Sequence, residues 1–159
     1  MEKARRACCI VIRDSQLLFV QQTIREGALR QVFIGGAIEE DETPHEAALR
    51  ELAEEANVQG EIIFGPALYE ATLKEYVFIV RIPDDAQPTL GYDPELAHDK
   101  QVIHGLIWRD AVTAVEQFNR VDCAFFQAVV DEAEKMDVQA PWRDVLEGIL
   151  HAKNEGEGH

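Results

Sequence analysis

Cysteine is scarce in this 159-residue chain, and its three cysteines form no C-x-x-C pair. Cys8 and Cys9 are neighbours in an apolar stretch, which is typical of buried strand thiols, and Cys123 stands alone. An odd cysteine count without a secretory signal is typical of a reducing compartment, and no apolar run is long enough to cross a membrane. We therefore expect a soluble, cytoplasmic protein.

Basic residues are also few. Fifteen Lys and Arg stand against 30 Asp and Glu, so the formal net charge is -15. Proteins that hold duplex nucleic acid need clustered Lys and Arg to neutralise phosphates, and this composition excludes that class. An acidic site can hold a small phosphorylated substrate only if divalent cations lie between the two. The charge therefore predicts a metal wherever a phosphate binds.

The remaining composition is that of a globular protein. Hydrophobic residues make up 47% and charged residues 28%, which argues against a disordered or fibrous chain. The length suits one domain with a continuous core, and we find no internal repeat. We expect a single domain over residues 1–153 and a polar C-terminal tail over residues 154–159.

Strand signals precede helix signals, with one helix inserted among the strands. A hairpin is expected through Asp14-Ser15, and the paired glycines Gly35-Gly36 mark a tight backbone. The expected strands are Ala7–Ile12, Leu17–Val20, Gln31–Ile34, Ile62–Phe64, Tyr76–Ile82 and Val102–Trp108, and the expected helices are Pro44–Ala56, Asp110–Glu116, Val121–Met136 and Trp142–Ala152. This order predicts an α+β fold or an α-β-α sandwich.

The helix from Pro44 to Ala56 is specified at both ends. Thr43 is a suitable N-cap, Pro44 takes the first helical position, and Glu46 completes a capping box. Asn57 occupies the position of a left-handed C-terminal cap, where Asn is the usual second choice after Gly. We therefore predict this helix from local signals alone.

Three glutamates gather on one side of this helix. Glu51 and Glu55 are four residues apart and stand one above the other, and Glu54 adjoins both. Like charges at this spacing destabilise a bare helix, whereas Mg²⁺ takes carboxylate oxygens together with waters and substrate phosphates. Taken alone, E-x-x-E-E is more often a solvated helical face, with Arg50 as an exposed partner of Glu46 or Glu54.

The wider pattern favours the metal interpretation. Gly36, Glu42, Arg50-Glu51-Leu52, Glu54-Glu55 and Val58 stand at the spacing G-x5-E-x7-R-E-U-x-E-E-x-G-U, in which U is apolar. This segment resembles the Nudix box, and only the last glycine departs from it, being Asn57 here. Asn enters the left-handed region readily, so the substitution is compatible with the helix cap.

The resemblance implies the Nudix fold, a mixed β-sheet between helices, and a hydrolase that uses Mg²⁺, with Mn²⁺ as a substitute. It implies metal binding by Glu51, Glu54, Glu55 and the Gly36 carbonyl, with Arg50 orienting the glutamates and Glu42 in the loop that shapes the site. Glu51 is a candidate general base, and further candidates lie before and at the start of the strand that ends at Trp108: Glu95, Asp99 and His104.

Substrate contacts are less specified. Arg25 and Arg30 are candidates for binding phosphates, and Phe33 and Tyr76 for stacking on a base. Many relatives carry a tryptophan and a proline just before the paired glycines, where this chain has Gln31 and Ile34. The loop is therefore expected to differ from theirs.

The expected reaction is Mg²⁺-dependent hydrolysis of a diphosphate linkage in a nucleoside diphosphate derivative, such as ADP-ribose, a nucleotide sugar or a dinucleoside polyphosphate. The alternatives are a pyrophosphohydrolase of damaged or non-canonical nucleoside triphosphates, an isomerase that uses one of the cysteines, and a non-catalytic nucleotide sensor. The intact glutamates favour an enzyme. A homodimer is common in the fold by resemblance, and the sequence leaves the oligomeric state open.

Overall fold

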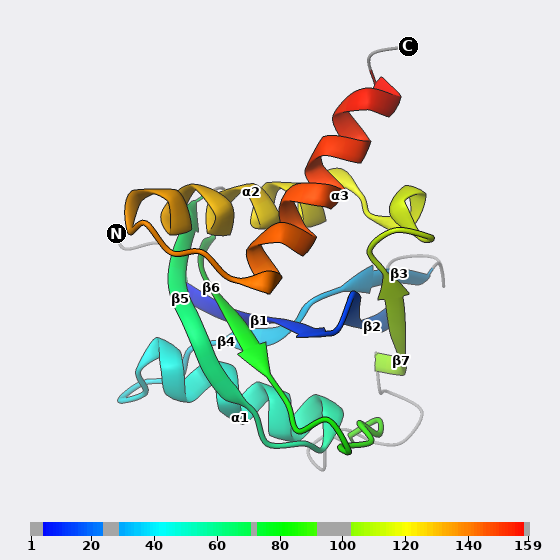
Figure 1. Ribbon diagram of the computed structural model, residues 1–159. Helices are drawn as coiled ribbons and strands as arrows, with labels where there is room; N and C mark the ends of the chain where they lie inside the picture. Colours follow the sequence, from blue (N-terminus) through cyan, green and yellow to red (C-terminus); the bar gives the residue numbers. More distant parts are fainter. Residues whose placement is uncertain (1–4, 24–28, 71–72, 92–102, 158–159) are drawn as a thin grey trace.

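A computed structural model describes residues 5–23, 29–70, 73–91 and 103–157 (Figure 1). Its seven strands are β1 (Arg5–Arg13), β2 (Gln16–Thr23), β3 (Leu29–Val32), β4 (Ile34–Ala37), β5 (Glu61–Glu70), β6 (Lys74–Arg81) and β7 (Ile103–Asp110). Its helices are α1 (Pro44–Ala56), the short 3-10 helix η3 (Val115–Gln117), α2 (Arg120–Lys135) and α3 (Pro141–Glu157). No helix among the described residues is long and apolar enough to span a membrane.

The strands form one mixed sheet. The order is β3-β2-β1-β6-β5, with β4 also paired to β1 and β7 also paired to β2. The β1–β6 pair is parallel, and the remaining pairs are antiparallel. Strand β1 thus lies between β4 on one side and β6 on the other, at the centre of the sheet.

Helices cover both faces of this sheet, as Figure 1 shows, with α1 on one face and α2 and α3 on the other. Successive residues of a strand point to opposite faces, so β1 contributes to two separate cores. Ala7, Cys9 and Val11 pack toward α1, whereas Cys8 and Ile10 pack toward α2 and α3. The expected α-β-α sandwich is confirmed.

Several expected elements are confirmed. The hairpin forms between β1 and β2, and α1 runs from Pro44 to Ala56, as predicted. Strand β5 extends well beyond the expected Ile62–Phe64, through Gly65 and Pro66. Its register with β6 shifts between Phe64 and Ala67, and an edge strand accommodates proline there.

Other boundaries require correction. The single strand expected over Gln31–Ile34 is two strands separated at Phe33, because β3 pairs with β2 and β4 with β1. The helix expected over Asp110–Glu116 is the end of β7 followed by turns and η3. Asp110 Oδ1 accepts the backbone N–H groups of Val112 and Thr113 at 2.8 and 2.9 Å, which favours a turn over a helix.

The C-terminal boundary also differs from the expectation. Helix α3 continues past Ala152 to Glu157, so residues 154–157 belong to the helix and not to a tail. Polar residues continue a helix readily once its apolar face is packed, and Leu146 and Ile149 of α3 are fully buried.

Candidate active site

Helix α1 is fixed by caps at both ends. Thr43 Oγ1 accepts the Glu46 N–H at 3.1 Å, and Glu46 Oε1 accepts the Thr43 N–H at 2.9 Å, which completes the capping box. Asn57 adopts the left-handed conformation with φ 54° and donates its N–H to the Ala53 carbonyl at 3.1 Å. The predicted start and end of the helix are therefore confirmed in their hydrogen bonds.

The face of α1 that packs on the sheet is built from small residues. Ala47, Ala48 and Ala56 are fully buried with Leu52, and the Cys9 thiol donates to the Ala48 carbonyl at 3.3 Å. Small side chains let the helix axis approach β1 and β4 closely. The neighbouring glutamates Glu51 and Glu55 are thereby pressed against the sheet.

The paired glycines of β4 make this approach sterically feasible. A side chain at Gly35 would collide with the Ala7 carbonyl and with Cys8 of β1, and one at Gly36 would collide with the Glu51 carboxylate. The Gly35 N–H donates to Glu55 Oε2 at 2.8 Å. The two glycines therefore bring backbone groups against both carboxylates.

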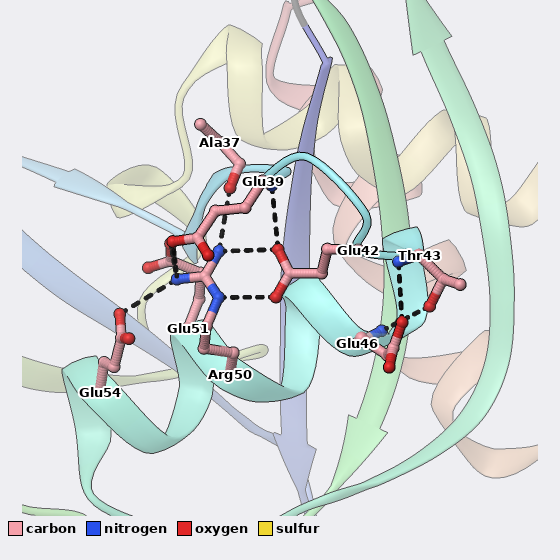
Figure 2. Close-up of polar contacts among 8 residues, drawn as sticks. All are labelled: Ala37, Glu39, Glu42, Thr43, Glu46, Arg50, Glu51 and Glu54. Carbon is pink, nitrogen blue, oxygen red and sulfur yellow. Dashed lines mark hydrogen bonds and ion pairs between the residues drawn. The ribbon is translucent and has the colours of Figure 1, made fainter.

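Arg50 links the helix to the loop before it (Figure 2). Its Nε and Nη2 donate to the two oxygens of Glu42 at 2.7 and 3.0 Å, and Nη2 also donates to the Ala37 carbonyl at 3.0 Å. Its Nη1 donates to Glu51 Oε1 at 3.0 Å and to Glu54 Oε2 at 3.2 Å. One guanidinium thus holds three carboxylates and one backbone carbonyl.

Glu42 completes this clamp. Glu42 Oε1 accepts the Glu39 N–H at 3.0 Å, which fixes the loop between β4 and α1. The hydrogen bond from Arg50 is the main cause that lowers the pKa of Glu42, and the Glu42 hydrogen bond in turn raises the pKa of Arg50. Both groups are therefore charged throughout the physiological range.

The pKa values of Glu51 and Glu55 are shifted in the opposite direction, upward. Burial raises the pKa of Glu51, against the opposing charge of Arg50. Burial, followed by the charge of Glu51, raises the pKa of Glu55 from 4.5 to about 8. When two buried carboxylates lie close together, ionisation of both is unfavourable unless a cation binds between them.

Within the described residues, no three His, Cys, Asp or Glu side chains are already arranged to hold a metal ion. Arg50 takes one oxygen each of Glu51 and Glu54, and Gly35 takes one of Glu55. The second oxygen of each carboxylate accepts no hydrogen bond from the described residues, and hard oxygen donors are what Mg²⁺ prefers. The donor set therefore fits a hard divalent cation in its chemistry.

The expected substrate contacts are not gathered at these carboxylates. Phe33 is buried on the α2 face, where its ring stacks on Phe125 with centroids 5.5 Å apart, so it is a core residue in place of the expected base-stacking one. Tyr76 is half-buried against the core beneath α1. Arg30 is exposed and donates to Gln22 at 3.4 Å.

Arg25, Glu95 and Asp99 lie outside the described residues, as does the side chain of His104. The structure adds one pair that the sequence did not indicate, Arg6 and Glu75, whose side chains meet at 3.1 Å. Arg6 and Glu75 meet because of the register between β1 and β6, and this register cannot be deduced from the positions of the two residues in the sequence.

The comparisons with known proteins agree with this geometry. A NUDIX domain model matches residues 2–120. No curated protein matches the sequence. Among solved structures, the chain is similar to a NUDIX hydrolase from Nitrosomonas europaea, with a TM-score of 0.60 and 19% identity over 95% of this chain and 74% of that chain.

Two further structures share the fold. A NUDIX-family hydrolase from Clostridium perfringens has a TM-score of 0.57 and 13% identity over 81% of this chain and 97% of that chain. An ADP-ribose pyrophosphatase from Streptococcus suis has a TM-score of 0.51 and 13% identity over 69% and 75%. The family model covers the sheet and the glutamate helix α1, and the chain therefore belongs to the NUDIX hydrolase family.

Proposed function

We propose that this protein hydrolyses a diphosphate linkage in a nucleoside diphosphate derivative, such as ADP-ribose, a nucleotide sugar or a dinucleoside polyphosphate, with Mg²⁺ as its cofactor. The observation that carries the proposal is the set of Glu51, Glu54 and Glu55 on one side of α1, each with one carboxylate oxygen that accepts no hydrogen bond from the described residues. In a chain of net charge -15, such a set suits cation binding better than direct anion binding.

The three glutamates and the Gly36 carbonyl would hold the metal. A bound Mg²⁺ supplies charge neutralisation for the diphosphate and lowers the pKa of water in the site. Arg50 keeps Glu51 and Glu54 oriented toward this position, and Glu42 keeps Arg50 in place through two hydrogen bonds. Mn²⁺ accepts the same oxygen ligands and is proposed as a substitute.

The proposed reaction is a displacement at phosphorus. The oxygen of a water molecule forms a bond to one phosphorus, the bond from that phosphorus to the bridging oxygen breaks, and the other phosphate leaves with the bridging oxygen. A carboxylate accepts the water proton. Glu51 is the described candidate, because one of its carboxylate oxygens accepts no hydrogen bond from the described residues. Glu95 and Asp99 are the other candidates.

The ADP-ribose class is supported by the likeness in fold to the Streptococcus suis ADP-ribose pyrophosphatase. An isomerase that uses cysteine is disfavoured by the placement of Cys8 and Cys9. Both thiols are buried in the two cores, and burial raises the pKa of each well above its ordinary value. Neither therefore offers a thiolate to a substrate.

The proposal is tested with a panel of ADP-ribose, other nucleoside diphosphate sugars, dinucleoside polyphosphates and nucleoside triphosphates, each with Mg²⁺ and each with EDTA. Glu55→Gln is the inactivated variant, and Glu61→Gln, on an exposed side chain of β5, is the matched control. We expect two phosphorylated fragments from one diphosphate class, with Mg²⁺ only, and loss of activity in Glu55→Gln alone.

Other outcomes would redirect the proposal. Turnover of nucleoside triphosphates alone would replace the diphosphate class with the triphosphate one. No turnover in any arm, together with nucleotide-dependent thermal stabilisation, would overturn hydrolysis on this panel and favour a nucleotide sensor.

A further inference from the structure

Arg6 lies on β1 beside the glycine strand. Its backbone is in register with Ala37 of β4 on one side and with Glu75 of β6 on the other. Ala37 follows Gly36 directly, and its carbonyl accepts the hydrogen bond from Arg50. Arg6 therefore stands one strand away from the loop that carries the carboxylate clamp.

The guanidinium of Arg6 makes one hydrogen bond to the described residues, through Nε. Its Nε donates to Glu75 Oε1 at 3.1 Å, with side-chain exposures of 39% for Arg6 and 15% for Glu75. The terminal groups Nη1 and Nη2 donate to none of the described residues. A guanidinium has five N–H groups, so within the described part of the chain four of them have no acceptor and can bind a ligand.

Arg50 differs in this respect. All three nitrogens of its guanidinium donate hydrogen bonds, to Glu42, Glu51, Glu54 and Ala37. Its side chain is 23% exposed and is committed to orienting carboxylates. Arg50 therefore has an acceptor for every guanidinium nitrogen, whereas Arg6 is held by one hydrogen bond and its two terminal nitrogens have no acceptor among the described residues.

Arg6 is also close to the carboxylates along the sheet. Its register partner Ala37 directly follows Gly36, and the Glu51 carboxylate lies against Gly36. On β1, Arg6 shares its face with Cys8, and Cys8 pairs with Gly35, which carries no side chain on that face. A ligand at the edge of β4 would thus have carboxylates on the α1 side and a guanidinium on the other.

We propose that Arg6 binds a phosphate group of the substrate diphosphate, and that Glu75 is the positioning residue that holds the Arg6 guanidinium in place. This inference rests on the proposed function. A partly exposed arginine held by one carboxylate suits bidentate, charge-assisted hydrogen bonding to phosphate oxygens. In this acidic chain, Arg6 would attract the phosphate directly, whereas the glutamates would attract it only through a bound metal ion.

The test measures binding of adenosine α,β-methylene diphosphate, which hydrolysis does not consume, by calorimetry with Mg²⁺. The variants are Arg6→Gln, Arg6→Lys and the double variant Arg6→Gln with Glu75→Gln, which leaves no unpaired buried carboxylate. Arg81→Gln is the control, because Arg81 pairs with Glu61 at 2.9 Å on exposed positions at the opposite end of β6.

We expect Arg6→Gln and the double variant to weaken binding by about tenfold or more, with Arg6→Lys between them and the wild type. For the substrate that the panel identifies, KM should rise by a similar factor, with a smaller change in kcat. Arg81→Gln should bind as the wild type does.

Two results would overturn the inference. The first is unchanged analogue affinity in the double variant, whatever happens to its melting temperature, which would make the Arg6–Glu75 pair purely structural. The second is an equal loss in Arg81→Gln, which would indicate a general charge effect. If the wild type neither binds the analogue nor cuts any diphosphate, the proposed function fails, and Arg6 fails with it.

Discussion

Burial and a neighbouring negative charge both raise the pKa of Glu55. Its carboxylate is largely withdrawn from solvent, is influenced by the charge of Glu51 and accepts one hydrogen bond from the Gly35 N–H. Burial is the main cause that raises its pKa from 4.5 to about 8. At neutral pH the metal-free protein is therefore expected to hold a proton on Glu55, and the proposed divalent cation would have to displace that proton.

The stability of the metal-free protein is expected to fall as the pH rises from about 4.5 to about 8. In this window the unfolded chain has released the Glu55 proton while the folded protein keeps it, so a rising pH favours unfolding, and the effect levels off above the folded pKa. Urea unfolding in EDTA across the window measures the decline. Glu55→Gln cannot ionise and should make the decline smaller, with the raised pKa of Glu51 contributing to what remains. An equal decline in both proteins would refute this role of Glu55.

Replacing Arg50 should cost both stability and activity. Arg50→Ala leaves Glu42, Glu51 and Glu54 without their shared partner, and we expect the free energy of unfolding to fall by about 2 kcal/mol. Arg50→Lys cannot reproduce the two-point contact with Glu42 and should recover only part of the loss. Urea unfolding and initial rates measure the two effects.

Arg81→Ala serves as the control, since this arginine pairs with Glu61 on the surface and should change stability by less than about 1 kcal/mol. Equal effects of the two alanine variants would contradict the clamp at Arg50.

At the scale of elements, α1 connects the local sequence to the site. Its caps fix where the helix begins and ends, its alanine face brings it against β1 and β4, and the glycines of β4 receive its carboxylates. The segment before Gly91 also packs on its C-terminal end, where the Gly91 N–H donates to the Glu55 carbonyl at 2.9 Å. The position of the glutamates is therefore set by the whole helix.

The C-terminal cap of α1 can be tested at Asn57. Because its φ is 54°, glycine suits this position, and Asn57→Gly should leave the free energy of unfolding within about 0.5 kcal/mol of the wild type. Asn57→Ala places a less tolerant side chain in the left-handed region and should destabilise by about 1 kcal/mol. Thermal unfolding compares the two, and a more stable alanine variant would contradict this account of the cap.

The parts predicted from the sequence are those with local causes. Helix α1 was predictable to its ends because Thr43, Pro44 and Asn57 specify them within the segment itself. The turn at Asp110 was missed because the Asp110 side chain accepts the backbone N–H groups of Val112 and Thr113 and so competes with helical hydrogen bonds. The spacing of apolar residues carries no information about such hydrogen bonds. Arg6 was missed because only the register of β1 with β4 and β6 brings it near the carboxylates.

At the scale of the whole molecule, charge and architecture act together. A net charge of -15 would repel a diphosphate, and the fold also concentrates three carboxylates on one side of α1. With a cation bound there, the repulsion among them becomes attraction to a common charge. We therefore expect the stability of the folded protein to depend on a bound divalent cation.

Mg²⁺ should raise the melting temperature, and EDTA should reverse the rise. A ligand that binds only the folded state at a hundred times its Kd stabilises by about 2.7 kcal/mol. The rise should be larger at higher pH, because a protonated Glu55 competes with the metal. Differential scanning fluorimetry measures it, with Glu61→Gln expected to respond fully and Glu55→Gln weakly; equal responses in both variants would exclude α1 as the metal site.

The central claim, that α1 supports metal-dependent attack of water on a diphosphate, is tested most directly by running the reaction in heavy-oxygen water and weighing the products by mass spectrometry. We predict one labelled oxygen on the phosphate of one fragment, formed with Mg²⁺ and lost in EDTA and in Glu55→Gln. Fragments without label, or equal yields in Glu55→Gln and the wild type, would contradict it.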